Sequence, residues 1–87
     1  MVSQKVVVNS MIGLHLRPAG DLCKLAMRYQ SKITFRFKNY TANAKSVLSV
    51  LGACVKGNDE IEIFCEGPDE EEALQALVDL LENRIDT

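Results

Sequence analysis

Residues 31–38 read SKITFRFK, in which charged or polar side chains alternate with Ile33, Phe35 and Phe37. Successive side chains of a β-strand point to opposite faces of the sheet, so this segment has one apolar and one polar face. Residues 60–66, which read EIEIFCE, follow the same alternation. Strands with one polar face are typical of an antiparallel sheet that is covered on one side and open to water on the other.

Five further elements are predicted around these two strands. They are, in chain order, a strand over 2–8, an amphipathic helix over 16–28, a short strand near 41–42, a short helix over 46–52 and a last helix that begins at 69. The order βαββαβα predicts an α+β open-faced β-sandwich, in which three helices cover one face of a four-stranded antiparallel sheet. Because 87 residues have room for one hydrophobic core, residues 1–87 are expected to form a single domain.

The helix starts are marked by residues that suit a first turn. Pro18 falls in the first turn of the helix over 16–28, where a missing amide hydrogen costs little. Ser46 precedes an apolar cluster and is expected to be the N-cap of the short helix. Asp69 followed by Glu72 predicts a capping box, with Asp69 as the cap of the last helix.

The composition excludes several classes of protein. Hydrophobic residues make up 47% and charged residues 25% of the chain, which argues against disorder. No apolar run approaches the roughly 20 residues of a membrane span, and the polar start of the sequence argues against a secretory signal. We therefore expect no direct insertion into a membrane.

The three cysteines, Cys23, Cys54 and Cys65, are odd in number and lie far apart, without a C-x-x-C pair. This usage fits a reduced, cytoplasmic protein with no disulfide framework and no zinc knuckle. We expect the thiols to be small buried fillers rather than reactive groups. Because the chain also has a single histidine, we expect no metal site and no cofactor.

The net charge of −2 conceals a strong asymmetry along the chain. Residues 1–45 hold eight basic residues and one acidic residue, whereas residues 46–87 hold two basic and eleven acidic residues. The asymmetry favours a partner, acidic protein or nucleic acid, that faces the basic half. Alternatively, the two halves interleave in the fold and their charges are solvated. The strand over 31–38 lacks interleaved exposed aromatics for base stacking, and the pI is about 5.3, so we expect no binding to nucleic acid.

The lone histidine, His15, lies between Gly13 and Pro18 at the start of the helix over 16–28. Histidine is the side chain whose charge ordinarily changes near neutral pH. The positive end of the helix dipole disfavours imidazolium, so the ring is expected to be neutral and nucleophilic. A phosphoryl group on a ring nitrogen would face the free amides of the first helical turn, and Arg17 could donate to its oxygens. The alternative is that His15 is only a polar residue of an exposed turn.

Two motifs, GLHLRPA at residues 13–19 and KSVLSVL at residues 45–51, resemble the signatures of the HPr family, the phosphocarriers of the bacterial phosphoenolpyruvate-dependent sugar phosphotransferase system. Residues 13–19, GLHLRPA, are similar to the phosphohistidine signature of that family. Residues 45–51, KSVLSVL, followed by Lys56-Gly57, are similar to the second signature, a lysine-serine pair that opens the short second helix. Length, element order and both motif positions agree, so the resemblance covers essentially the whole chain and implies the same open-faced sandwich.

The resemblance implies a role for each matching residue. His15 would accept a phosphoryl group at Nδ1 from enzyme I, which is charged by phosphoenolpyruvate, and would pass it to sugar-specific permease components. Arg17 would match the active-site arginine. Ser46 would match the regulatory serine that HPr kinase/phosphorylase modifies, although a plain helix cap would also place a serine there. The protein would be a phosphohistidine intermediate rather than a free-standing enzyme, and we expect a monomer.

We predict a docking surface for enzyme I that combines positive charge with apolar contact. Besides Arg17, its residues are Lys24, Arg28, Val47, Leu48 and Leu51. A helix of one or two turns cannot bury every side, so the three apolar residues are expected to be partly exposed. The alternative is that all three belong to the core.

Three residues depart from the family pattern. Ile12 stands where a small hydroxylic residue is common, Leu16 replaces the usual small residue beside the histidine, and Gly20 stands where a hydroxylic residue is common. A bulkier and more apolar rim could alter partner affinity or the lifetime of a phosphohistidine. A regulatory relative, as in nitrogen-type phosphotransfer branches, is the second interpretation that the sequence leaves open.

Overall fold

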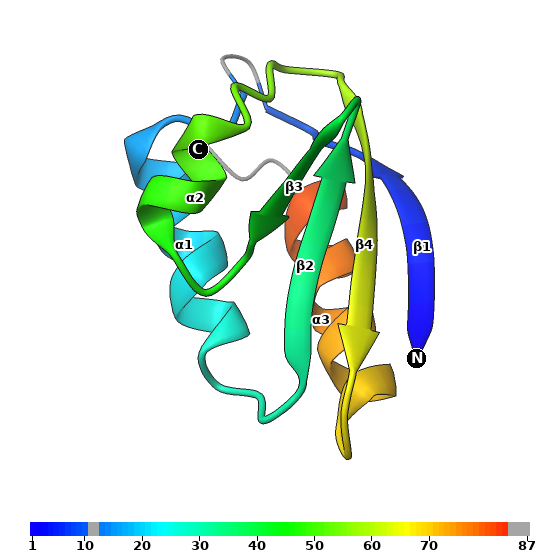
Figure 1. The fold of residues 1–87 in the computed structure, drawn as a ribbon. Helices are drawn as coiled ribbons and strands as arrows, with labels where there is room; N and C mark the ends of the chain where they lie inside the picture. The colour runs from blue at the N-terminus through cyan, green and yellow to red at the C-terminus, as the bar shows by residue number, and fades with distance from the viewer. Residues whose placement is uncertain (11–12, 84–87) are drawn as a thin grey trace.

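A computed structural model describes residues 1–10 and 13–83, and Figure 1 shows the arrangement of the elements. In chain order they are β1 (Val2–Val7), α1 (Leu16–Ala26), β2 (Lys32–Phe37), β3 (Tyr40–Asn43), α2 (Val47–Gly52), β4 (Glu60–Glu66) and α3 (Glu70–Glu82). This is the predicted βαββαβα order, and the bounds differ from the predicted ones by no more than two residues.

The four strands form one antiparallel sheet in the order β1-β4-β2-β3. The C-terminal strand β4 lies between β1 and β2, so Glu62 lies opposite Lys5 on one side and opposite Arg36 on the other. In Figure 1, α3 lies behind β2 and β4, and no helix of the described chain covers the near face of the sheet. The predicted sheet with one covered face is therefore confirmed.

One hydrophobic core fills the space between the covered face of the sheet and the helices. The sheet contributes every second residue of its strands, among them Ile33, Phe35, Ile61 and Ile63. The helices contribute Pro18, Ala19, Leu22, Cys23 and Ala26 of α1 and Ala73, Leu77, Val78 and Leu81 of α3. These positions follow the spacing of an amphipathic helix. Burial of a side chain such as Leu22 stabilises the fold by roughly 1.5–3 kcal/mol, so the core holds α1 in the place that the site requires.

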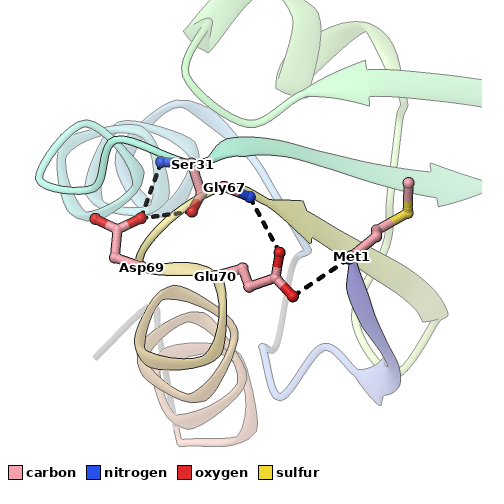
Figure 2. A network of polar contacts seen from close by, with 5 residues as sticks. All are labelled: Met1, Ser31, Gly67, Asp69 and Glu70. Atoms are coloured by element: carbon pink, nitrogen blue, oxygen red, sulfur yellow. Dashed lines mark hydrogen bonds and ion pairs between the residues drawn. The ribbon is translucent and has the colours of Figure 1, made fainter.

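The predicted capping box of Asp69 and Glu72 is wrong. Asp69 occupies the N-cap position of α3, but its side chain makes no capping hydrogen bond. Its carboxylate instead accepts a hydrogen bond from the amide of Gln30 at 2.8 Å. It also accepts hydrogen bonds from the amide of Ser31 at 2.9 Å and from the Ser31 hydroxyl (Figure 2). These bonds, that of the Ser31 hydroxyl foremost, hold the pKa of the Asp69 carboxyl below its ordinary value. Asp69 thus ties α3 to the segment that enters β2.

Glu70, rather than Glu72, reaches back to a free backbone amide. Its Oε1 accepts a hydrogen bond from the amide of Gly67 at 3.1 Å, and its Oε2 lies 3.2 Å from the amine of Met1 (Figure 2). The Gly67 amide, and after it the Met1 amine, lower the pKa of the Glu70 carboxyl. Gly67 has φ +156°, and a β-carbon on it would lie 2.6 Å from Cα of Ser31, so the turn requires glycine.

None of the helices within residues 1–10 and 13–83 is both long enough and apolar enough to cross a bilayer.

Candidate functional site

His15 is the N-cap residue of α1, and its extended backbone (φ −86°, ψ −172°) delivers the chain from the preceding loop into the helix. Its carbonyl accepts the first helical hydrogen bond, from the amide of Ala19 at 2.9 Å. Its side chain does not cap the helix. The backbone therefore holds the imidazole at the helix start, and neither ring nitrogen is used for capping.

The two ring nitrogens of His15 lie in different surroundings. The residue is half-buried, and its Nε2 is enclosed without a hydrogen-bond partner, alone in this respect among the side-chain nitrogens and oxygens of the described residues. His15 is therefore not simply a polar residue of an exposed turn. Nδ1 is not enclosed in this way.

The loop before His15 lies directly against the segment that follows α2. The amide of Leu14 donates to the carbonyl of Val55 at 2.9 Å, and the amide of Gly13 donates to the hydroxyl of Ser10 at 2.7 Å. Gly13 has φ +102°, and a β-carbon on it would come within 2.3 Å of the Val55 carbonyl oxygen. Only glycine fits this contact, which holds the loop that leads into His15 against the segment after α2.

The first turn of α1 offers hydrogen-bond donors beside the imidazole. The amides of Leu16 and Arg17 begin the helix and have no partner within the described chain. Pro18 follows with no amide hydrogen and is buried. The side chain of Arg17 is exposed and forms no ion pair with any described residue. Two amides without a partner, the positive end of the helix and an exposed guanidinium therefore belong to the first turn, directly after His15 in the chain.

Ser46 is the N-cap of α2, as predicted. Its hydroxyl accepts a hydrogen bond from the amide of Ser49 at 3.2 Å. The residue before it joins α2 to α1: Lys45 donates from Nζ to the carbonyl of Tyr29 at 2.7 Å, and the Lys45 carbonyl accepts from Sγ of Cys23 at 3.1 Å. These bonds place Ser46 and the start of α2 beside the C-terminal half of α1.

The predicted docking residues lie on α1 and α2 but differ in exposure. Lys24 and Arg28 are exposed, and Leu48 is 82% exposed. Val47 and Leu51 are half-buried and pack against the core. The apolar patch on α2 therefore centres on Leu48 and includes only the outer parts of its two neighbours.

Two exposed apolar residues lie outside the predicted docking set: Leu16, which was noted only as a departure from the family pattern, and Met27, which was not noted. Leu16 is 69% exposed and Met27 is 66% exposed, at the start and just past the end of α1. Both fall outside the apolar stripe of the helix, and that is the signal by which they could have been found. Of the other departures from the family pattern, Gly20 has open space around it, and Ile12 lies outside the described residues.

The prediction that the thiols are buried is confirmed for two cysteines and wrong for the third. Cys23 and Cys65 are buried, whereas Cys54 is exposed, in a left-handed conformation (φ +56°) after α2. Cys54 ends up outside because the chain must reverse there. Burial, with smaller contributions from Glu70 and Asp69, raises the pKa of the Cys65 thiol to about 11. The described residues contain no group of three or more candidate metal ligands.

Comparison with known proteins gives the family of this domain with a histidine at a helix start. Residues 2–83 match the family model described as "PTS HPr component phosphorylation site". The phosphocarrier protein HPr of Lysinibacillus sphaericus is 37% identical over 81 residues, which cover 93% of this chain and 92% of that protein. The chain belongs to the HPr family.

Solved structures agree with this assignment. The crystal structure of HPr-C-His from Thermoanaerobacter tengcongensis is similar with a TM-score of 0.95 and 33% identity, and the match covers 100% of this chain and 98% of that one. The crystal structure of Crh, the Bacillus subtilis catabolite repression protein, is similar with a TM-score of 0.79 and 32% identity, over 97% of each chain. The predicted fold class and family are thereby confirmed.

Proposed function

We propose that this phosphocarrier carries its phosphoryl group on Nδ1 of His15. The observation that supports the proposal most strongly is the difference between the two ring nitrogens, because Nε2 is enclosed without a partner. In the transfer step, the lone pair of Nδ1 forms a bond to phosphorus while the bond between phosphorus and the donor group breaks, and its electron pair leaves with the donor. A neutral imidazole has no proton on the attacking nitrogen, so the step needs no separate base.

The donor is enzyme I, charged by phosphoenolpyruvate, and the acceptors are sugar-specific permease components. Catalysis of phosphoryl transfer consists mainly of positioning and of stabilising charge on the equatorial oxygens. The amides of Leu16 and Arg17 are placed for that task at the positive end of α1. The guanidinium of Arg17 adds a planar pair of donors, which suits phosphate oxygens better than a point charge.

Enzyme I and the acceptors dock on the surface that surrounds His15. Its basic residues are Arg17, Lys24 and Arg28. Its apolar residues are Leu48 and the outer parts of Val47 and Leu51 on α2, together with Leu16 and Met27 at the two ends of α1. Exposed leucines and methionines next to basic side chains fit partners that present an acidic surface with an apolar centre. The charges would raise the rate of encounter, and the apolar contacts would lengthen the lifetime of the complex.

Ser46 is the proposed site of regulatory phosphorylation by HPr kinase/phosphorylase. Its hydroxyl already occupies the N-cap of α2, where negative charge is favoured, so a phosphate can be accommodated without unfolding. The added charge of roughly −1.5 to −2 would lie next to Leu48 and the basic residues of α1. It would therefore repel the acidic surface of enzyme I.

A regulatory protein is the second candidate function, since Crh of Bacillus subtilis is also among the similar structures. In either role we place the protein in the cytoplasm, where it would meet its partners by diffusion. Incubation with phosphoenolpyruvate and enzyme I, followed by intact mass measurement, separates the two candidates. A phosphocarrier gains one phosphoryl group that is lost in acid, whereas a protein that acts only through Ser46 stays unmodified by enzyme I.

A further inference from the structure

The face of the sheet opposite the helices carries a regular pattern of charge, which we call the open face. On β4 it presents Glu60, Glu62, Phe64 and Glu66, and on β2 it presents Lys32, Thr34 and Arg36. The register places Glu66 opposite Lys32, Phe64 opposite Thr34 and Glu62 opposite Arg36. An acidic stripe therefore runs beside a basic stripe, with one aromatic ring between the charges.

These opposite charges form no ion pair with one another within one copy of the described chain. Among the described residues the one ion pair is that of Met1 and Glu70, so Glu62 does not pair with Arg36, nor Glu66 with Lys32. A hollow on the same face is lined by Met1, Lys32, Thr34, Thr41, Phe64 and Glu66. The open face therefore has free charges of both signs and a partly apolar recess at its centre.

The arrangement of the two stripes restricts what can cover the open face. A nucleic acid would meet the row of glutamates on β4 and be repelled. A protein surface of a single sign would be attracted by one stripe and repelled by the other. A surface that carries the same two stripes in the opposite order would satisfy both. We propose that the open face is a self-complementary interface on which a second copy of this chain packs.

A two-fold axis that runs along the strands between β2 and β4 produces this complementarity. In such an isologous interface, each contact occurs twice with the residues exchanged. The axis places β4 of one copy over β2 of the other at the same height along the strands. The register then brings Glu62 over Arg36, Glu66 over Lys32 and Phe64 over Thr34 of the second copy.

The outer strands do not oppose this packing. The same axis places β1 over β3, so that Lys5 faces Thr41 and Ser3 faces Asn43. No pair of like charges meets in these rows, and the Phe64 ring enters the hollow beside Thr34 and Thr41. Two twisted sheets pack face to face in this way in β-sandwiches, with their strands within about 30° of each other.

The area of the open face sets the strength of the dimer. Four strands spaced about 4.8 Å apart and about six residues long cover roughly 400 Å², or roughly 800 Å² for both copies. Stable interfaces bury about 1,200–2,000 Å², so the dimer is transient and forms only at high concentration. The monomer expected from the sequence is then the species at low concentration. Because α1 and α2 lie on the other side of the sheet, the surface around His15 stays free in this dimer.

Charge reversal across the proposed interface gives the sharpest test. Arg36→Glu places glutamate against Glu62 of the second copy, and Glu62→Arg places arginine against Arg36. Each variant alone should lose self-association by roughly tenfold or more, which corresponds to about 1.4 kcal/mol. An equimolar mixture of the two variants should associate again, because every contact between unlike copies is then opposite in sign. The double variant Arg36→Glu/Glu62→Arg should also associate with itself.

The measurement is the concentration dependence of amide chemical shifts up to about 1 mM protein, at about 0.01 M and about 0.5 M salt. We expect shifts on β2 and β4 that weaken at high salt. Arg28→Glu and Glu82→Arg, reversals of exposed charges outside the open face, are the matched controls and should associate like wild type. Thermal unfolding checks that the two single variants fold. If one of them does not fold, self-association of the double variant tests the proposal.

The proposal is overturned by any of three results. One is a wild-type protein whose shifts do not depend on concentration at low salt. Another is an association that survives both single reversals, as a dimer formed by exchange of a strand would. The third is a set of concentration-dependent shifts that lie on α1 and α2 instead of on the sheet.

Discussion

Gly13 lies so close to Val55 that a β-carbon on Gly13 would come within 2.3 Å of the Val55 carbonyl oxygen. This contact, together with the hydrogen bond from the Leu14 amide to the same oxygen, joins the loop before His15 to the segment after α2. The position of the imidazole therefore depends on a contact between Gly13 and Val55, which are 42 residues apart in the sequence.

Replacement of Gly13 by alanine should displace His15. The positive φ of +102° is unfavourable for alanine, and the clash adds to it, so we expect a loss of about 1–3 kcal/mol in the free energy of unfolding and slower phosphoryl transfer. Gly20→Ala is the matched control, because a β-carbon at Gly20 meets nothing within 4 Å. Inside α1 it should stabilise the protein by up to about 1 kcal/mol. Urea unfolding and transfer rates check both; equal behaviour of the two variants would contradict the role of the contact.

Arg17→Lys should slow transfer without weakening the fold. Lysine keeps the charge but loses the planar pair of donors. A charge-assisted hydrogen bond is worth about 1.5–3 kcal/mol, and about 1.4 kcal/mol corresponds to tenfold in rate, so a loss of roughly tenfold is expected. Because Arg17 is exposed, unfolding should move by less than about 0.5 kcal/mol. Arg36→Lys, an exposed arginine of β2 outside the docking surface, serves as the control in the same assay, and a large change in stability with an unchanged rate would make Arg17 structural.

Substitutions at Ser46 should separate capping from charge. Ser46→Ala removes the acceptor for the Ser49 amide and should destabilise the protein by about 0.5–2 kcal/mol with a near-normal rate of phosphorylation by enzyme I. Ser46→Asp keeps an acceptor at the N-cap and should leave stability near wild type, while the added charge slows phosphorylation by roughly tenfold or more. Rapid mixing with phosphorylated enzyme I, followed by chemical quench, measures the rate of phosphorylation. If enzyme I phosphorylates Ser46→Asp as fast as wild type, Ser46 is a helix cap without a regulatory role.

The Asp69 carboxylate should make stability depend on pH in the acid range. Its pKa is lowered in the folded protein, chiefly by the Ser31 hydroxyl. The carboxylate therefore contributes stability that is fully present above the pKa of the unfolded chain, about 4, and is lost as the pH falls through the folded pKa. The difference in unfolding free energy between wild type and Asp69→Asn should be largest near neutral pH and shrink on acidification. Asp21→Asn, on the exposed face of α1, should differ little from wild type; a constant difference for Asp69→Asn would contradict the account.

Much of the fold follows from local patterns in the sequence. The alternation in residues 31–38 and 60–66 and the spacing of apolar residues in α1 locate the elements, since these periods are properties of strands and helices themselves. The Ser46 cap is local as well, and was predicted. The order of the strands is not local, because β1, the first strand of the sheet in the chain, pairs with β4, the last.

The errors have a common physical cause. The Asp69 side chain does not cap α3, because its carboxylate accepts hydrogen bonds from three donors at Gln30 and Ser31, which are distant in the sequence. Cys54 is exposed because the chain reverses after α2. The enclosure of Nε2 of His15 likewise depends on tertiary packing and could not be found from the motif, which indicated the histidine but not the nitrogen.

The central claim is that Nδ1 of His15 carries the phosphoryl group, and nitrogen NMR of the phosphorylated protein tests it most directly. The protein is labelled with ¹⁵N at histidine, phosphorylated with phosphoenolpyruvate and a catalytic amount of enzyme I, and compared with the unphosphorylated form. Because His15 is the sole histidine, its two ring nitrogens are the only side-chain signals. The account predicts coupling to phosphorus at Nδ1, with the signal lost after brief acid treatment and absent in His15→Ala. Coupling at Nε2, or a stable phosphate on His15→Ala, would contradict it.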